Sequence, residues 1–136
     1  MLLTKRYFYI KLLIFRIITH TSPATALSWG LNIAAAGNDG RVSFYDEDGG
    51  YVRTFNYSSD ASVREFTTAS FNSSGDSVVL GNFSKYFVYA WDVQKAAWEE
   101  VNSKSIENLL SITTLSWKPD GSKLCLGASC GVVDVY

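Results

Sequence analysis

The sequence predicts an all-β fold built from repeated antiparallel sheets, and three observations carry this prediction. Aromatic residues make up 15% of the 136 residues, and the chain contains two prolines, a composition that favours strands. Short apolar segments alternate with turn sequences such as Asn38-Asp39-Gly40 and 47–50, whose residues tolerate the backbone of tight hairpins. The same order of segments recurs three times along the chain.

Each repeat begins with a strand that ends in an aromatic residue. Trp29, Phe71 and Trp117 occupy this position, 42 and 46 residues apart. A polar turn and a short apolar strand ending in glycine follow, at Gly37, Gly81 and Gly127. A second turn and an alternating strand come next, at 42–46, 87–92 and 132–136, and the first two repeats have fourth strands at 51–55 and 96–101. Four strands in about 40–45 residues are typical of a blade of a WD40-type β-propeller.

We therefore divide the chain at residue 20. Residues 21–136 are the WD40-repeat region, with blades at about 24–55, 66–101 and 111–136, the last without its outer strand. Propellers close about four to eight blades into a ring. We accordingly expect part of a larger propeller or an incomplete gene model, with completion of a ring by oligomerisation as the alternative. The fold class is then a partial WD40-like β-propeller of about three blades.

The match to the WD40 repeat is degenerate. Trp91-Asp92 is the one Trp-Asp pair, Tyr45-Asp46 is a variant of it, and the Gly-His dipeptide that usually opens such a blade is absent. Asp39 suits the turn aspartate of the first repeat, whereas the equivalent turn of the second repeat has none. We expect that the usual buried hydrogen-bond set of His, Asp and Trp does not form.

Residues 1–20 differ in charge from the rest of the chain. They carry four basic and no acidic side chains, whereas the other 116 residues carry eight basic and 13 acidic ones. These charges interrupt the apolar stretch, so no membrane-spanning helix is predicted. A signal peptide with Ala24-Thr25-Ala26 as its cleavage motif and a mitochondrial presequence are alternatives, although Arg16 breaks the apolar run. We favour an outer strand of a preceding blade or a non-native start.

Composition and cysteine usage exclude several classes of function. The chain is 47% apolar and 18% charged, which is typical of a globular domain. A net charge of −1 argues against a nucleic-acid partner. Cys125 and Cys130 are five residues apart and His20 is the single histidine, so a zinc site lacks ligands. We predict no catalytic, cofactor-binding or metal-binding residues, and no cofactor.

Two acidic groups and three glycosylation sequons have alternative interpretations. Residues 46–48 and 99–100 contain the paired carboxylates that glycoside hydrolysis uses, but we interpret them as a solvated turn and a protected strand edge. Asn56, Asn72 and Asn82 begin sequons that matter only if the chain is exported.

Several segments of the repeat region resemble one protein family. Arg64-Glu65-Phe66-Thr67-Thr68-Ala69 and Trp98-Glu99-Glu100 are not part of the general repeat. Together with Phe55-Asn56-Tyr57-Ser58, Ser77-Val78-Val79-Leu80-Gly81 and Leu115-Ser116-Trp117-Lys118, they are similar to the intraflagellar transport protein 172 family, a WD40 subunit of the ciliary intraflagellar transport B complex. The resemblance covers about Ile17 to Tyr136 and does not include residues 1–16.

The resemblance implies a non-catalytic protein–protein interaction scaffold in intraflagellar transport. The implied partners are other subunits of that complex, and the implied location is the cilium and the cytoplasm at its base. Neither nucleic acid nor a small-molecule substrate is expected. Arg64 and Glu65, in the loop before the second blade, are candidate partner contacts. The alternatives are a WD40 adaptor of another coat-like or trafficking assembly and a secreted propeller enzyme or lectin.

Overall fold

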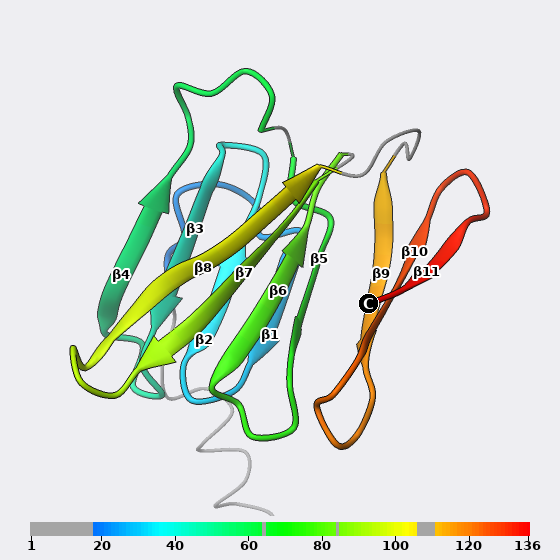
Figure 1. Cartoon of the computed structure of the whole chain (residues 1–136). Helices are drawn as coiled ribbons and strands as arrows, with labels where there is room; N and C mark the ends of the chain where they lie inside the picture. The colour runs from blue at the N-terminus through cyan, green and yellow to red at the C-terminus, as the bar shows by residue number, and fades with distance from the viewer. Residues whose placement is uncertain (1–17, 64, 84, 106–110) are drawn as a thin grey trace, which may run out of the picture.

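The computed structural model describes residues 18–63, 65–83, 85–105 and 111–136. Within these residues the chain forms eleven strands and no helix, which confirms the predicted all-β fold class (Figure 1). Of the N-terminal segment 1–20, only 18–20 are among the described residues.

The strands form three antiparallel sheets in chain order. The first sheet contains β1 (Ala26–Trp29), β2 (Ile33–Ala36), β3 (Arg41–Tyr45) and β4 (Tyr51–Asn56). The second sheet contains β5 (Thr68–Phe71), β6 (Ser77–Gly81), β7 (Lys85–Asp92) and β8 (Ala97–Ser105). The third sheet contains β9 (Ile112–Trp117), β10 (Leu124–Ala128) and β11 (Val133–Val135). Each strand pairs with its neighbour in sequence, as short hairpin connections dictate.

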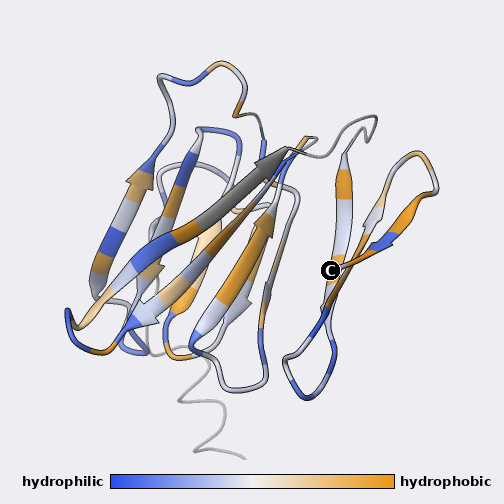
Figure 2. Ribbon diagram, in the orientation of Figure 1, coloured by the Kyte–Doolittle hydropathy of each residue, from blue (hydrophilic) through white to orange (hydrophobic). Residues whose placement is uncertain are grey.

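Local turn chemistry fixes the hairpins. In the turn between β3 and β4, the carboxylate of Asp46 accepts hydrogen bonds from the backbone N–H groups of Asp48 at 3.0 Å and Gly50 at 2.6 Å. Gly49 has a φ of 82°, a conformation that glycine adopts without steric cost. The carboxylates of Asp92 and Asp120 accept hydrogen bonds from backbone N–H groups in the same way, in the turns that follow β7 and β9. Figure 2 shows hydrophilic residues in the turn after β9 and hydrophobic residues along β6.

The first strands of the three sheets lie side by side, with β5 between β1 and β9. The turns that follow β1 and β5 touch, because Leu31 N donates to Gly75 O at 2.8 Å. A Cβ atom at Gly30 would lie 2.7 Å from the same carbonyl oxygen and would overlap the ring of Phe71. The glycine therefore allows the two sheets to approach closely at this end.

The interface between the first and second sheets is a large aromatic core. Phe44 of β3 stacks on Trp98 of β8, with ring centroids 4.6 Å apart and an interplanar angle of 11°. Tyr89 meets Phe44 edge-on at 5.7 Å. Small residues of β2 face this core, and Ala34 and Ala36 are fully buried. Aromatic rings of the second sheet therefore fill the space that the alanines leave, and this burial is the main stabilising contribution between the two sheets.

The interface between the second and third sheets is smaller and mostly aliphatic. Its buried members are Val79, Tyr86, Ile112, Leu115, Leu124, Leu126 and Ala128. Trp117 packs beside this cluster, and its indole Nε1 donates to the carbonyl oxygen of Ser70 at 2.9 Å. The third sheet is thus attached to the second by one apolar face and by cross-sheet hydrogen bonds such as this one.

Candidate interaction surface

The loop between β4 and β5 carries the predicted partner contacts. Two apolar residues fix it to the body of the molecule, because Val63 is 8% exposed and Phe66 is fully buried. The backbone N–H of Phe66 donates to Gly37 O at 3.0 Å. Glu65 lies between these two anchors and is exposed. The structure therefore presents Glu65 to solvent on a fixed loop, whereas Arg64 lies outside the described residues.

Tyr57 ties the start of this loop to the second sheet. Its hydroxyl donates to Glu100 Oε2 at 2.5 Å and lies 2.7 Å from the hydroxyl of Tyr89, which acts as donor to it. Burial and the neighbouring Glu100 carboxylate raise the pKa of Tyr57. Burial, chiefly, also raises the pKa of Tyr89. Both phenols therefore stay protonated, and this chain of hydrogen bonds holds the two sheets together.

Asp60 adds a second exposed carboxylate to the loop. Its Oδ1 accepts hydrogen bonds from Ser62 Oγ at 2.6 Å and from Ser62 N at 2.9 Å. These hydrogen bonds from Ser62 lower the pKa of Asp60, and the positive charge of Lys85 lowers it further. Asp60 is therefore ionised at neutral pH. Together, Asp60 and Glu65 give the described part of the loop two negative charges, a surface that complements a basic partner.

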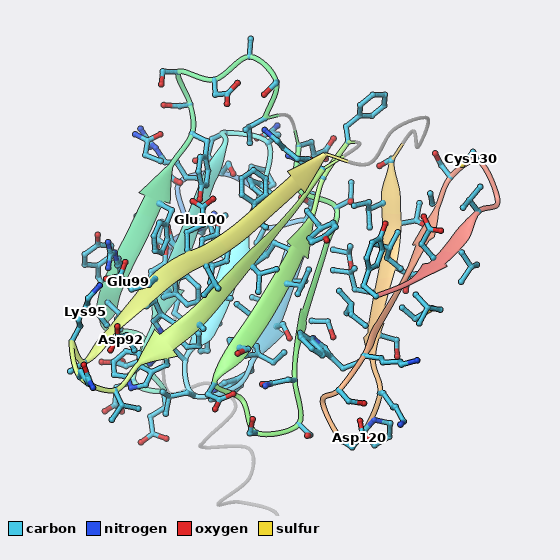
Figure 3. The ribbon with its side chains drawn as sticks, viewed as in Figure 1. Asp92, Lys95, Glu99, Glu100, Asp120 and Cys130 are labelled. Atoms are coloured by element: carbon cyan, nitrogen blue, oxygen red, sulfur yellow. The ribbon has the colours of Figure 1, made fainter. Side chains whose placement is uncertain are left out.

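The predicted acidic pairs form local interactions rather than a catalytic pair. Glu99 Oε1 lies 3.5 Å from Arg53 Nη1 and 3.5 Å from Lys95 Nζ. Figure 3 shows Glu99, Lys95 and Asp92 gathered near the β7–β8 hairpin, with Glu100 further along β8. Glu100 accepts a hydrogen bond from the Tyr57 hydroxyl. The carboxylate of Asp46 accepts hydrogen bonds from backbone N–H groups of the turn in which it lies.

His20 forms a side-chain hydrogen bond with Tyr45, the residue before Asp46 in the first repeat. His20 Nδ1 and the hydroxyl of Tyr45 share a hydrogen bond of 3.0 Å, and Tyr45 takes the place of the usual tryptophan. Burial lowers the pKa of His20, and the negative charge of Asp39 opposes that shift. Among the described residues, Nε2 of His20 is buried without a hydrogen-bond partner. This bond joins His20 to a tyrosine hydroxyl, and it is not the set of His, Asp and Trp that the sequence analysis considered.

A cavity of about 540 Å³ lies against the first sheet. Its walls are mostly apolar and consist of Ile18, His20, Ala24, Leu27, Ser28, Trp29, Ile33, Ala35 and Tyr45. Small-molecule sites usually add a few converging polar groups to such walls. Here Nδ1 of His20 and the hydroxyl of Tyr45 bond to each other, whereas Nε2 of His20 has no hydrogen-bond partner among the described residues.

The cysteines do not suggest a metal site. Both thiols are free, with Cys125 partly buried on β10 and Cys130 exposed in the turn that follows (Figure 3). No cluster of three or more His, Cys, Asp or Glu side chains that could hold a metal ion occurs within the part of the chain that the structure describes. In the same described part, no helix has the length and apolar character to span a bilayer.

The three sequon asparagines differ in burial and in their hydrogen bonds. Asn82 is fully buried. Asn72 donates to Asp76 Oδ1 at 2.8 Å and accepts the backbone N–H of Ser77 at 3.1 Å. Asn56 is exposed, and its Oδ1 accepts the backbone N–H of Ser58 at 2.9 Å. Glycosylation of the folded chain at Asn82 is therefore sterically blocked.

Two threonines that the sequence analysis did not single out connect successive sheets. Thr25 Oγ1 donates to the carbonyl oxygen of Phe66 at 2.5 Å. Thr67 Oγ1 donates to the carbonyl oxygen of Ile112. The sequence feature that could have identified them is their spacing, because each threonine precedes the aromatic residue of its repeat by four positions.

Comparison of sequences identifies relatives of this chain. No family model matches it. It is 46% identical over 121 residues to intraflagellar transport protein 172 of Chlamydomonas reinhardtii, which covers 89% of this chain and 7% of that protein. The human homolog is 43% identical over 122 residues, with the same coverage. Intraflagellar transport protein osm-1 of Caenorhabditis elegans is 33% identical over 101 residues, covering 74% of this chain and 6% of the relative. The chain thus spans less than a tenth of the length of these relatives.

Comparison of structures identifies the fold. The crystal structure of Sqt1 from Chaetomium thermophilum, a WD40 protein, matches with a TM-score of 0.72 and 20% identity, over 87% of this chain and 33% of that one. Sqt1 of Saccharomyces cerevisiae gives a TM-score of 0.72 and 19% identity. At this identity the match establishes the fold alone, which is a partial WD40-like β-propeller, as predicted.

Proposed function

Because the chain belongs to the intraflagellar transport protein 172 family, we propose that it is a non-catalytic protein–protein interaction scaffold in intraflagellar transport. The observation that carries this proposal is the 46% identity to the Chlamydomonas relative over 89% of the chain. We place the chain in the cilium and in the cytoplasm at the ciliary base, with other subunits of the intraflagellar transport complex as its partners. The comparisons favour neither of the alternative functions.

The fold is consistent with a scaffold role. Propeller sheets present exposed loops at both ends of their strands, and such loops serve as interaction platforms when no site for chemistry is present. The carboxylates of 46–48 and 99–100, which would suit a glycosidase, are exposed or occupied by local hydrogen bonds and ion pairs. We therefore assign the chain a binding role rather than a catalytic one.

Within this role we propose that Glu65 contacts a basic surface of a partner subunit, with Arg64 beside it in sequence. Glu65 is exposed on a loop that Val63 and Phe66 hold in place. A loop that is already ordered loses little conformational entropy on binding. Asp60, five residues earlier in the same loop, adds a second carboxylate.

The test uses the purified chain as bait in soluble extracts of Chlamydomonas flagella, with captured proteins identified by mass spectrometry. We expect capture of other intraflagellar transport subunits. Glu65→Lys should weaken capture, whereas Glu47→Lys should not, because Glu47 is also exposed but lies in the turn at the opposite end of β4. If no transport subunit is captured by the folded chain, the proposed function is wrong. If both variants capture transport subunits as well as the parent chain does, only the proposed role of Glu65 is wrong.

A further inference from the structure

We draw no further inference here: the strongest candidate, the apolar cavity that His20, Trp29 and Tyr45 line on the face of the first sheet, carries nothing, because residues 1–17 lie outside the described part of the chain and nothing in the structure shows what covers that face.

Discussion

The indole Nε1 of Trp98 donates a hydrogen bond to Asn32 Oδ1 at 2.9 Å, across 66 residues of sequence. Trp98 belongs to β8, the outer strand of the second sheet, whereas Asn32 lies in the turn after β1 of the first sheet. The ring of the same tryptophan stacks on Phe44. Its backbone carbonyl oxygen accepts a hydrogen bond from Arg53 Nη1 at 2.6 Å. One side chain and its backbone therefore join three parts of the first sheet to the second.

Replacing Trp98 should remove the centre of the aromatic core. Trp98 is fully buried, so we expect Trp98→Ala to lower the free energy of unfolding by about 3–5 kcal/mol, as large-to-small core changes do. Urea denaturation measures this loss. Tyr51→Ala is the control and should change stability by less than about 0.5 kcal/mol, because its side chain is on the surface. Equal losses in the two variants would contradict the central role of Trp98.

Thr67→Val should loosen the third sheet. The substitution removes the hydroxyl that bonds to Gly81 O and Ile112 O, so we expect a loss of about 1 kcal/mol in the free energy of unfolding. Hydrogen exchange should also become faster in β9 and β10. Thr113→Val, which removes a bond within the third sheet alone, is the comparison. Unchanged exchange in β9 after Thr67→Val would show that the hydroxyl does not connect the sheets.

Acid should destabilise the first sheet through His20. Burial lowers the pKa of His20 below its ordinary value of 6.5, so the folded state prefers the neutral ring. The resulting stability is fully present above pH 6.5 and is lost as the pH falls through the lowered value. Asp39 faces His20, but its pKa is also below its ordinary value of 3.8, because hydrogen bonds from Thr21 and the Arg41 amide outweigh the effect of burial.

The check is the free energy of unfolding measured on both sides of pH 6.5. We expect the parent chain to lose stability below this pH and His20→Gln to lose less. If the two proteins have parallel pH profiles, protonation of His20 does not contribute.

Alkali should weaken the contact between the first two sheets. The pKa values of Tyr57 and Tyr89 are both raised above 10.0, which means that the folded state prefers the protonated phenols. This stability is fully present below pH 10.0 and is lost as the pH rises through the folded-state values. Denaturation at pH values below and above 10.0 should show a smaller alkaline loss in Tyr89→Phe than in the parent. A variant that loses stability as steeply as the parent would refute this assignment.

The sequence by itself determined the strands and the turns. Strands β1 and β5 lie at 26–29 and 68–71, where the repeat predicts them. Turns such as 46–50 fold through hydrogen bonds between residues two to four positions apart. These features depend on neighbours in the chain, so alternation of apolar residues and turn chemistry suffice to predict them.

One detail of the repeat was misread. The sequence suggests that Gly37 is the counterpart of Gly81 and Gly127. In the structure, Gly81 and Gly127 pair with residues of the neighbouring strand, whereas Ala36 occupies that position in the first sheet and Gly37 follows it. A Cβ atom at Gly37 would instead overlap the carbonyl oxygen of Pro23. The glycine serves a contact with a preceding segment, which the spacing of the repeat does not reveal.

Only the tertiary structure decided which residues connect the sheets. The bonds from Thr25 to Phe66, from Thr67 to Ile112 and from Trp98 to Asn32 join residues 41 to 66 positions apart. Their formation depends on the angle and distance at which complete sheets pack, and a single sequence does not specify these quantities locally. The sequence also identified Glu65 as a candidate contact, but its exposure between two buried anchors follows from how Val63 and Phe66 pack into the body of the molecule.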